Sequence, residues 1–191
     1  FSKIKARTGG RLRIFISGGA PLAREIAEFF GAAGMLVCEG YGLSETSPVI
    51  TCNFPGRVKP GTVGLPLEHV EVKIAADGEI LTRGPHVMKG YFRKPEATAE
   101  AIEKDGWFHT GDIGFVDAEG CLVITDRKKD IIVTSGGKNI APQHLEGKLK
   151  QIAAVSQAVA IGDRRPYVVA LLTLDPLRVA AEAEKAGSPA R

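Results

Sequence analysis

The hydrophobic and polar positions of the first 40 residues follow the pattern of a strand–helix–strand unit. Leu12–Ile16 is a short run rich in β-branched and aromatic side chains, which predicts a buried strand. Apolar residues then recur at helical spacing up to Phe30, and Pro21 is expected at the first helical position. The apolar run Met35–Cys38 predicts a second strand, parallel to the first, because such units have a right-handed crossover.

A glycine-rich loop follows each of these two strands. The first is Ser17–Ala20 (SGGA) and the second is Glu39–Glu45 (EGYGLSE). Parallel strands end at the same edge of a sheet, where open α/β folds bind their ligands. The pattern therefore predicts that both loops lie side by side at a nucleotide site.

From about Pro48 to Thr125 the pattern changes to short alternating segments typical of antiparallel strands. Glycines and prolines punctuate this stretch, and the turn at Ala76–Gly78 predicts a hairpin. The expected elements are strands at Val70–Ile74 and Glu79–Thr82, a short helix within Lys94–Lys104, a loop at Trp107–Ile113, and strands at Phe115–Val116 and Leu122–Thr125.

A third part begins near Asp126, where a charged run leads into an apolar one. The apolar run is Ile131–Val133. We expect a helix from Pro142, strands at Val155–Ile161 and Tyr167–Leu174, and a helix from Pro176 to near Gly187. The predicted fold class is α/β and α+β. Its parts are the end of a parallel-sheet nucleotide-binding subdomain (1–47), a small antiparallel β subdomain (48–125), and a hinge with a partial, mobile α+β C-terminal domain (126–191).

Composition narrows the function classes. The 191 residues are 44% hydrophobic and 25% charged, typical of a soluble globular protein. The net charge of +3 is spread along the chain, which argues against a nucleic-acid partner. Three distant cysteines without metal-ligand spacing indicate reduced thiols and a cytoplasmic location. The sequence has no apolar run of membrane-spanning length. It begins with Phe1 and not with Met, so we expect a piece of a longer protein.

The loop around Tyr41 has the side chains of a nucleotide site. Tyr41 lies between Gly40 and Gly42, so its ring has an uncrowded face on which a base could stack. Glu45 supplies the carboxylate oxygen that Mg²⁺ prefers, and Ser44 supplies a hydroxyl for a phosphate. Taken alone, the segment also fits a tight turn with an exposed tyrosine.

Two later segments add candidates of the same kind. Asp112, in a glycine-kinked segment, could accept both hydroxyls of a ribose, and Arg127 has a planar donor fork for ribose or phosphate. Taken alone, Asp112 is equally a turn residue and the run around Arg127 a solvated face. For Trp107 and His109 we favour packing over chemistry.

The order of these segments resembles the adenylate-forming superfamily of acyl-CoA synthetases, adenylation domains and luciferases. Within it, the sequence is most similar to the C-terminal part of long-chain fatty acid–CoA ligases. The matching segments are SGGAPL (Ser17–Leu22), GYGLSET (Gly40–Thr46), GWFHTGD (Gly106–Asp112), ITDRKKDIIVTSGGKNIAP (Ile124–Pro142) and QAVAIGD (Gln157–Asp163).

The resemblance implies a role for each matching residue. Glu45 would bind Mg²⁺ and act in catalysis with Ser44, which stands where the family usually has Thr and contacts phosphate. The remaining roles are the adenine and acyl side of the pocket for Gly18, Gly19 and Ala20, adenine binding for Glu39, Gly40, Tyr41 and Gly42, ribose binding for Asp112 and Arg127, the hinge for Asp126, and the pantetheine tunnel for Gly136 and Gly137.

The implied activity is that of an ATP-dependent acid–thiol ligase. A fatty acid and ATP·Mg²⁺ would give an acyl-adenylate and pyrophosphate, and CoA, the co-substrate, would then give the thioester and AMP. Such chemistry depends mainly on positioning and charge neutralisation. The family's phosphate loop ending in Pro-Lys-Gly and its C-terminal lysine motif do not occur in the sequence, so we expect these 191 residues alone to be inactive.

Two other functions remain open from the sequence. One is an amino-acid-activating adenylation domain, and the other is a non-catalytic nucleotide-binding or regulatory fragment. The expected partners are fatty acid and CoA, with no nucleic acid and no transmembrane segment. Peripheral membrane contact and oligomerisation are left open.

Overall fold

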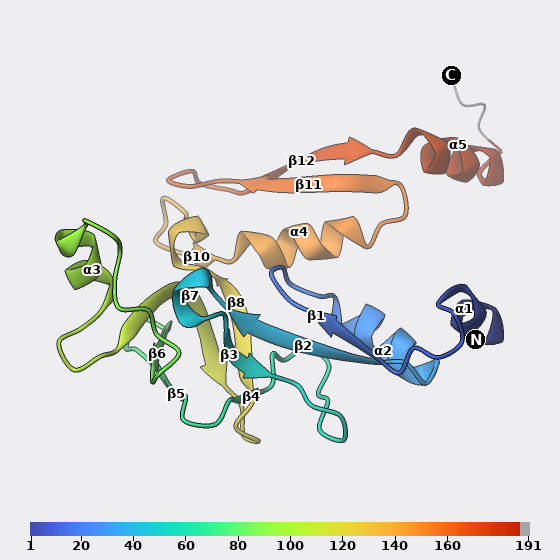
Figure 1. Ribbon diagram of the computed structural model, residues 1–191. Helices are drawn as coiled ribbons and strands as arrows, with labels where there is room; N and C mark the ends of the chain where they lie inside the picture. The colour runs from blue at the N-terminus through green and yellow to red at the C-terminus, as the bar shows by residue number, and fades with distance from the viewer. Residues whose placement is uncertain (188–191) are drawn as a thin grey trace. The chain divides into compact units, whose positions relative to one another are not determined.

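The computed structural model describes residues 1–187 and has a mixed α/β fold with several sheets (Figure 1). The chain divides into two compact units, Phe1–Ile124 and the part from Thr125 onward. The division falls inside strand β8 (Leu122–Arg127), one residue before Asp126. The expected boundary at 47/48 lies between strands of one continuous sheet. The three-part division and the mobility of the last part stay predictions.

The first sheet of unit 1 has the order β1-β2-β3-β4. Strands β1 (Ile14–Ser17) and β2 (Leu36–Gly42) are parallel, and helix α2 (Arg24–Ala32) connects them, so the predicted strand–helix–strand unit is confirmed. The prediction that the first strand is buried was wrong, because β1 is the edge strand of the sheet and Ile16 is 76% exposed. Strands β3 (Val49–Cys52) and β4 (Leu65–Pro66) extend the sheet in the antiparallel sense. The pattern did not predict β3, β4 or the short helix α1 (Ser2–Arg7).

Helix α2 begins later than expected. Pro21 was predicted at the first helical position, but Ala23 is the N-cap and the helix starts at Arg24. The backbone N–H of Leu22 instead donates a 3.1 Å hydrogen bond to the Glu39 carboxylate. That bond holds the chain as a loop against β2, so the prediction for Pro21 was wrong.

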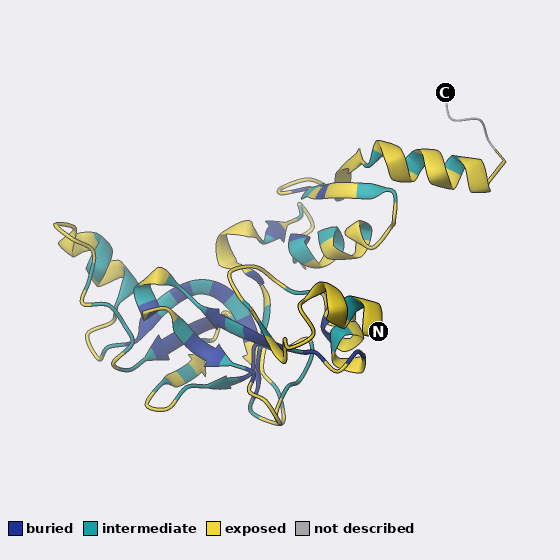
Figure 2. Cartoon of the chain, turned by 45° about the vertical axis from the view of Figure 1, so that its right-hand side comes forward, coloured by how far each residue is buried: buried dark blue, intermediate teal, exposed yellow. Residues whose placement is uncertain are grey.

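The second sheet of unit 1 has the order β5-β6-β7-β8. Strands β5 (Glu71–Ile74) and β6 (Glu79–Arg83) form the predicted hairpin, and β7 (Phe108–Val116) pairs with β6. Helix α3 (Pro95–Ala101) lies between β6 and β7 in the chain. One hydrophobic core contains residues of both sheets, namely Tyr41, Ile50, Val63, Ile80 and Leu122. Figure 2 shows the buried positions concentrated on these strands.

Strand β7 corrects a prediction, because Trp107–Ile113 was expected to be a loop. Alternate residues of the strand are buried, with Phe108 2%, Thr110 8% and Asp112 5% exposed. Two of these three side chains are polar, so the segment lacks the apolar alternation by which strands are predicted. The Thr110 hydroxyl is satisfied within the sheet by donating to the carbonyl of Ile80 at 2.7 Å.

Unit 2 is a small α+β arrangement (Figure 1). Strands β9 (Ile132–Val133) and β10 (Asn139–Ile140) form a short antiparallel pair. Helix α4 (Pro142–Lys150) lies against β11 (Val155–Ile161), which pairs with β12 (Val169–Leu174), and helix α5 (Pro176–Lys185) follows. The apolar runs predicted α4, β11, β12 and α5 correctly, apart from small shifts at their ends, whereas the pair β9 and β10 was not predicted.

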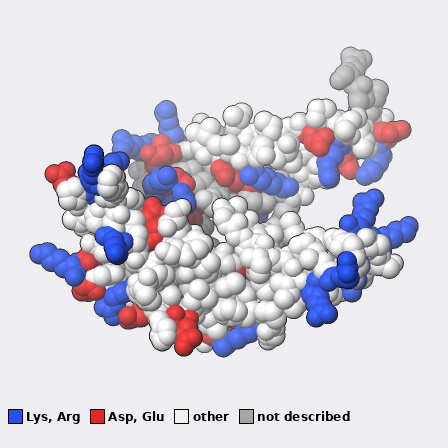
Figure 3. Space-filling view, viewed as in Figure 1, with Lys and Arg blue, Asp and Glu red and all other residues white. Residues whose placement is uncertain are grey.

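Charged side chains are less evenly spread than the sequence led us to expect, and the cysteines are unpaired. On the face shown in Figure 3, basic side chains gather at the end of unit 1 that contains α1, and both signs are mixed elsewhere. Cys38 and Cys121 are buried, Cys52 is half-buried, and all three are free thiols. Burial raises the pKa of the Cys38 and Cys52 thiols. Among residues 1–187, no helix has the length and apolar content needed to cross a membrane.

Candidate functional site

The first glycine-rich loop lies beside the glycine-rich end of β2. Ser17 is the register partner of Glu39. A Cβ atom at Gly18 would lie 3.3 Å from the carbonyl oxygen of Gly40, a closer approach than most side chains make. Glycine at position 18 thus lets the loop approach β2. The segment Glu39–Glu45 was expected to be a second loop, but the prediction was wrong for 39–42, because these residues pair with β1 and β3 as part of β2.

The side chain of Glu39 on β2 holds the segment that follows the first glycine-rich loop. The carboxylate accepts the N–H of Leu22 at 3.1 Å, and the residue is 8% exposed. Desolvation raises the pKa of Glu39, and the hydrogen bond from Leu22 opposes that rise. The Glu39 carboxylate therefore holds the backbone at Leu22 in place. Adenine binding by Glu39 stays a prediction.

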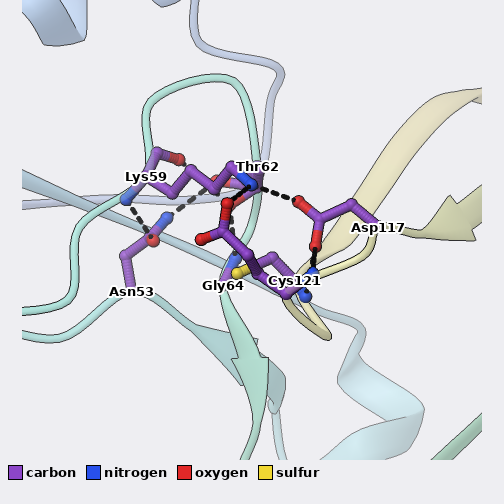
Figure 4. Close-up of polar contacts among 7 residues, drawn as sticks. Asn53, Lys59, Thr62, Gly64, Asp117 and Cys121 are labelled. Atoms are coloured by element: carbon purple, nitrogen blue, oxygen red, sulfur yellow. Dashed lines mark hydrogen bonds and ion pairs between the residues drawn. The ribbon is translucent and has the colours of Figure 1, made fainter.

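A polar cluster braces the other side of β2 (Figure 4). Asn53 donates its backbone N–H to the carbonyl of Glu39 at 2.9 Å and its side-chain amide to the carbonyl of Thr62 at 2.7 Å. The Asn53 Oδ1 atom accepts the backbone N–H of Lys59 at 3.0 Å. Asn53, 3% exposed, therefore fixes the loop that follows β3 to the strand that carries the nucleotide candidates.

Lys59 connects this loop to the turn between β7 and β8. Its ammonium lies 2.8 Å from Asp117 Oδ2 and 2.6 Å from Glu119 Oε1. Hydrogen bonds to these two carboxylates raise the pKa of Lys59, and the same contact lowers the pKa of Asp117. Sequence reasoning missed both Asn53 and Lys59. Their positions in a glycine- and proline-rich stretch marked only a loop.

Tyr41 and Asp112 meet although they are 71 positions apart in the sequence. The Tyr41 hydroxyl donates to Asp112 Oδ2 at 2.7 Å, and the two residues are 9% and 5% exposed. The adenine candidate and the ribose candidate are thus neighbours. Because little of Tyr41 is exposed, stacking of a base on its ring stays a prediction, as does ribose binding by Asp112.

The glycine after Tyr41 has a packing reason. A Cβ at Gly42 would overlap the backbone carbonyl of Pro48, so no other residue fits there without moving the chain. The pairing of β2 with β3 shifts register between Tyr41 and Gly42. Gly42 therefore lets the chain turn sharply into the segment that contains Ser44 and Glu45.

Ser44 and Glu45 lie on the single-turn 3-10 helix η1 (Ser44–Thr46). Thr46 is fully buried, and its hydroxyl accepts the N–H of Leu43 at 2.9 Å and donates to the carbonyl of Pro48 at 2.7 Å. This buried anchor fixes the turn while Ser44 is exposed and Glu45 is half-buried. Both candidates are thus accessible on a fixed backbone.

Glu45 fits a magnesium ion that takes most of its ligands from phosphate and water. Its carboxylate is a hard oxygen donor, and Oε1 accepts the Tyr91 hydroxyl at 3.0 Å, which leaves Oε2 to face a cation. Within residues 1–187, no group of three or more His, Cys, Asp or Glu side chains could hold a metal by itself. Mg²⁺ with nucleotide phosphate as co-ligand suits such a site better than a protein-only cage does.

Trp107 packs against basic side chains, whereas His109 is bonded to two carboxylates. The Trp107 ring has the Lys73 ammonium at 4.1 Å and the Arg83 guanidinium at 4.6 Å from its centre. The His109 nitrogens contact Glu79 and Glu103, each at 3.0 Å. These contacts stiffen the strand that carries Asp112.

In unit 2, Asp126 is almost fully buried, with 1% of its surface exposed. Its Oδ1 accepts the N–H of Arg127 at 2.7 Å, and its Oδ2 has no hydrogen-bond partner. Desolvation raises the pKa of Asp126, although backbone hydrogen bonds from Arg127 and Gln143 oppose the rise. Arg127 is exposed. The hinge role of Asp126 and the ribose contact of Arg127 stay predictions.

Gly136 and Gly137 form the exposed tip between β9 and β10. A Cβ atom at either position would meet nothing within 4 Å, and Gly137 has φ of +76°. The turn is closed by the Thr134 N–H, which donates to the carbonyl of Lys138 at 3.0 Å. Neither glycine is crowded, and the role predicted for them beside the pantetheine arm stays a prediction.

The structure distributes the candidates over both units. Unit 1 contains Gly18, Gly19, Ala20, Glu39, Gly40, Tyr41, Gly42, Ser44, Glu45 and Asp112, and unit 2 contains Asp126, Arg127, Gly136 and Gly137. Contacts within unit 1 tie its candidates together through the Gly18–Gly40 approach and the Tyr41–Asp112 bond.

Comparison with known families gives two matches along the chain. Residues 2–92 match the AMP-binding enzyme family. Residues 129–187 match the AMP-binding enzyme C-terminal domain. The first match contains the glycine-rich loops, and the second contains Gly136 and Gly137.

Curated relatives extend the likeness across both units. The long-chain-fatty-acid–CoA ligase FadD15 of Mycobacterium bovis is 49% identical over 176 residues, which are 92% of this chain and 29% of the relative. Long-chain-fatty-acid–CoA ligase 6 of Homo sapiens is 37% identical, over 98% of this chain and 29% of the relative. The chain thus spans less than a third of the length of these relatives.

Solved structures of related enzymes share the fold. ATP-bound MatB of Rhodopseudomonas palustris superimposes with a TM-score of 0.79 at 33% identity, over 94% of this chain and 40% of that one. The O-succinylbenzoate coenzyme A synthetase MenE of Bacillus subtilis, solved with ATP and magnesium ion, gives a TM-score of 0.76 at 32% identity, over 90% of this chain and 40% of that one.

Proposed function

Because this chain belongs to the AMP-binding enzymes, we propose that it is the adenine, ribose and Mg²⁺ side of an ATP-dependent long-chain fatty acid–CoA ligase. The relatives named as long-chain-fatty-acid–CoA ligases, which match nearly the whole chain, support the choice of fatty acid as substrate. The complete ligase is a longer polypeptide in these relatives.

The observation that carries the proposal is the buried hydrogen bond between Tyr41 and Asp112. It joins the loop expected to bind adenine to the strand expected to bind ribose. A nucleoside bridging these two residues would have its phosphates near the adjacent η1 turn, where Ser44 and Glu45 are accessible. Positioning of this kind is the main requirement of adenylate formation.

In the proposed reaction, the fatty carboxylate attacks the α-phosphorus of ATP and pyrophosphate leaves. The CoA thiol then attacks the acyl carbon, loses its proton, and displaces AMP. Ser44 would donate its hydroxyl to a phosphate oxygen, and Asp112 would accept the ribose hydroxyls. Mg²⁺ held by Glu45 would neutralise phosphate charge.

The second half-reaction would use unit 2. We propose that Asp126 is the hinge of a domain rotation between the two steps and that Arg127 contacts the ribose. Gly136 and Gly137 would line the path of the pantetheine arm, which the open space around both glycines favours. Glycine suits this role because a thin backbone leaves room for the arm.

Fatty-acid-dependent exchange of pyrophosphate into ATP tests the proposal on the full-length protein. We expect exchange with long-chain fatty acids and acyl-CoA formation when CoA is added. Exchange with an amino acid instead would indicate the adenylation domain of a peptide synthetase. Nucleotide binding without exchange for any acid would indicate a regulatory protein.

We also propose a cytoplasmic location with peripheral contact to membranes. Three free thiols, two of them buried, suit a reducing compartment. Fatty acids partition into membranes, so a ligase that uses them gains from contact with a lipid surface. Fractionation of cells, with release of the protein from membranes by salt, tests both parts of the proposal.

A further inference from the structure

The proposed metal carboxylate is held from two sides by one distant segment. The backbone N–H of Met88 donates to the carbonyl of Glu45 at 2.8 Å. The hydroxyl of Tyr91 donates to Glu45 Oε1 at 3.0 Å, across 46 positions of the sequence. Glu45 therefore has both its backbone and its side chain fixed by the residues that follow β6.

Tyr91 is itself held in place by helix α3. Thr98 on this helix accepts the N–H of Tyr91 on its hydroxyl oxygen at 2.9 Å and donates to the carbonyl of Lys94 at 2.9 Å. Gly90 has φ of +144°, and a Cβ there would come within 2.9 Å of the Thr98 hydroxyl oxygen. The turn that presents Tyr91 is thus closely fitted to α3.

The geometry of the pair favours a fixed donor. Tyr91 is 37% exposed, and its hydroxyl lies 3.0 Å from Glu45 Oε1. A glutamate side chain loses rotamer freedom when it binds a cation, and a fixed donor reduces the part of that loss that binding must overcome.

We propose that Tyr91 is a positioning residue for Glu45, holding Oε1 so that Oε2 is presented to a magnesium–nucleotide complex. This inference rests on the proposed function of Glu45. Tyr91 acts through Glu45 and needs no contact of its own with the substrates. Thr98 supports the same geometry through the backbone of Tyr91.

The first test compares full-length wild-type protein with Tyr91→Phe, which removes only the hydroxyl. We expect the Mg²⁺ concentration for half-maximal exchange to rise about 5-fold and kcat/KM for ATP to fall about 10-fold, the range for losing one ordinary, partly exposed hydrogen bond. The KM for fatty acid should stay unchanged. Tyr167→Phe is the matched control, because Tyr167 is 69% exposed in unit 2 and lies outside the proposed site.

A second measurement does not depend on activity. Mn²⁺ titration followed by electron paramagnetic resonance, with a non-hydrolysable ATP analogue present, should give weaker binding for Tyr91→Phe than for wild type. Thr98→Val should shift the Mn²⁺ curve in the same direction, and Thr98→Ser should restore it because serine retains the hydroxyl.

Identical metal curves for Tyr91→Phe and wild type would overturn the proposal, and so would a change in fatty-acid KM equal to the change for ATP. If the wild-type protein binds Mn²⁺ and nucleotide but shows no pyrophosphate exchange, only the proposed ligase function is contradicted. In that case the Tyr91→Phe shift in Mn²⁺ binding still decides the positioning role.

Discussion

The Tyr41 hydroxyl donates a 2.7 Å hydrogen bond to the Asp112 carboxylate inside unit 1, where both residues are buried. The bond joins β2 to β7, one strand from each sheet of the unit. Any account of nucleotide binding by this chain has to include it, because it fixes where both candidates lie.

Tyr41→Phe should remove this bond and leave the Asp112 carboxylate with one partner fewer. A buried hydrogen bond to a charged group contributes about 1.5–3 kcal/mol, so we expect a loss of unfolding free energy in that range. ATP should also bind more weakly, because Asp112 is held less firmly. Chemical denaturation and calorimetric ATP titration of the full-length protein measure the two effects. Unchanged stability and affinity would show that the bond has no energetic role.

Asn53→Ala should destabilise unit 1 by about 1–3 kcal/mol, because buried backbone groups of Thr62 and Lys59 lose their partner. Lys59→Met is the contrasting variant. Its ammonium is bonded to carboxylates at the surface, where ion pairs contribute little, so we expect a smaller loss. Denaturation of both variants at low and high salt checks this order. A larger loss for Lys59→Met would contradict it.

Asp126 should make stability fall as pH rises. Burial raises its pKa, so the folded state holds this proton more tightly than the unfolded state, whose value is about 3.9. Below the unfolded pKa the carboxyl is protonated in both states, so the cost of burying its charge is absent and stability is highest. The free energy of unfolding then declines as pH rises from there through the folded pKa. Asp126→Asn should remove this decline and be more stable than wild type at pH 7. Denaturation curves from pH 3 to 7 measure the difference between the two proteins. A less stable Asp126→Asn variant at pH 7 would mean that the carboxylate is net favourable.

Gly136→Ala separates stability from function. A Cβ at this position meets nothing within 4 Å, and the backbone is not in the left-handed region, so we expect no loss of stability. If the tip faces the pantetheine arm, the added methyl group should raise the KM for CoA several-fold and leave pyrophosphate exchange unchanged. The stability control is Gly42→Ala, which overlaps the Pro48 carbonyl and should destabilise. Equal KM values for CoA in Gly136→Ala and wild type would remove the tunnel assignment.

A polypeptide of these 191 residues should form no acyl-CoA from ATP, fatty acid and CoA. Its sequence contains neither the phosphate loop ending in Pro-Lys-Gly nor the C-terminal lysine motif that the family uses. An assay that measures thioester formation by the depletion of free CoA thiol checks this, with the full-length protein as the positive control. Turnover by the short polypeptide would show that these 191 residues contain a complete site.

The sequence predicted the elements that have continuous apolar runs. The parallel pair β1 and β2 and the ribbon β11 and β12 were recognised by such runs, although β12 is exposed along its whole length in this chain. Strand β7 was taken for a loop because two of its buried residues, Thr110 and Asp112, are polar and satisfied by hydrogen bonds. Hydrophobic periodicity cannot detect a strand of that kind.

In the candidate site, too, some residues were predicted from the sequence and others became evident only in the structure. Motif resemblance supplied Glu45 and Asp112, because their types and order are distinctive. It did not supply Tyr91, Thr98 or Asn53, whose importance comes from contacts with residues distant in the sequence. Such contacts depend on how the strands and loops approach one another, which a single sequence does not encode in any local pattern.

The low reactivity of the cysteines makes the chain suitable for labelling with a fluorescent dye at one introduced cysteine. Cys38 and Cys121 are buried, and raised pKa values make the Cys38 and Cys52 thiols poor nucleophiles near neutral pH. A cysteine introduced at Phe92, which is 84% exposed and follows Tyr91, would therefore react selectively with a maleimide dye. The three cysteines of this chain would contribute little background labelling, so the fluorescence of such a conjugate would test whether a magnesium–nucleotide complex binds near Glu45.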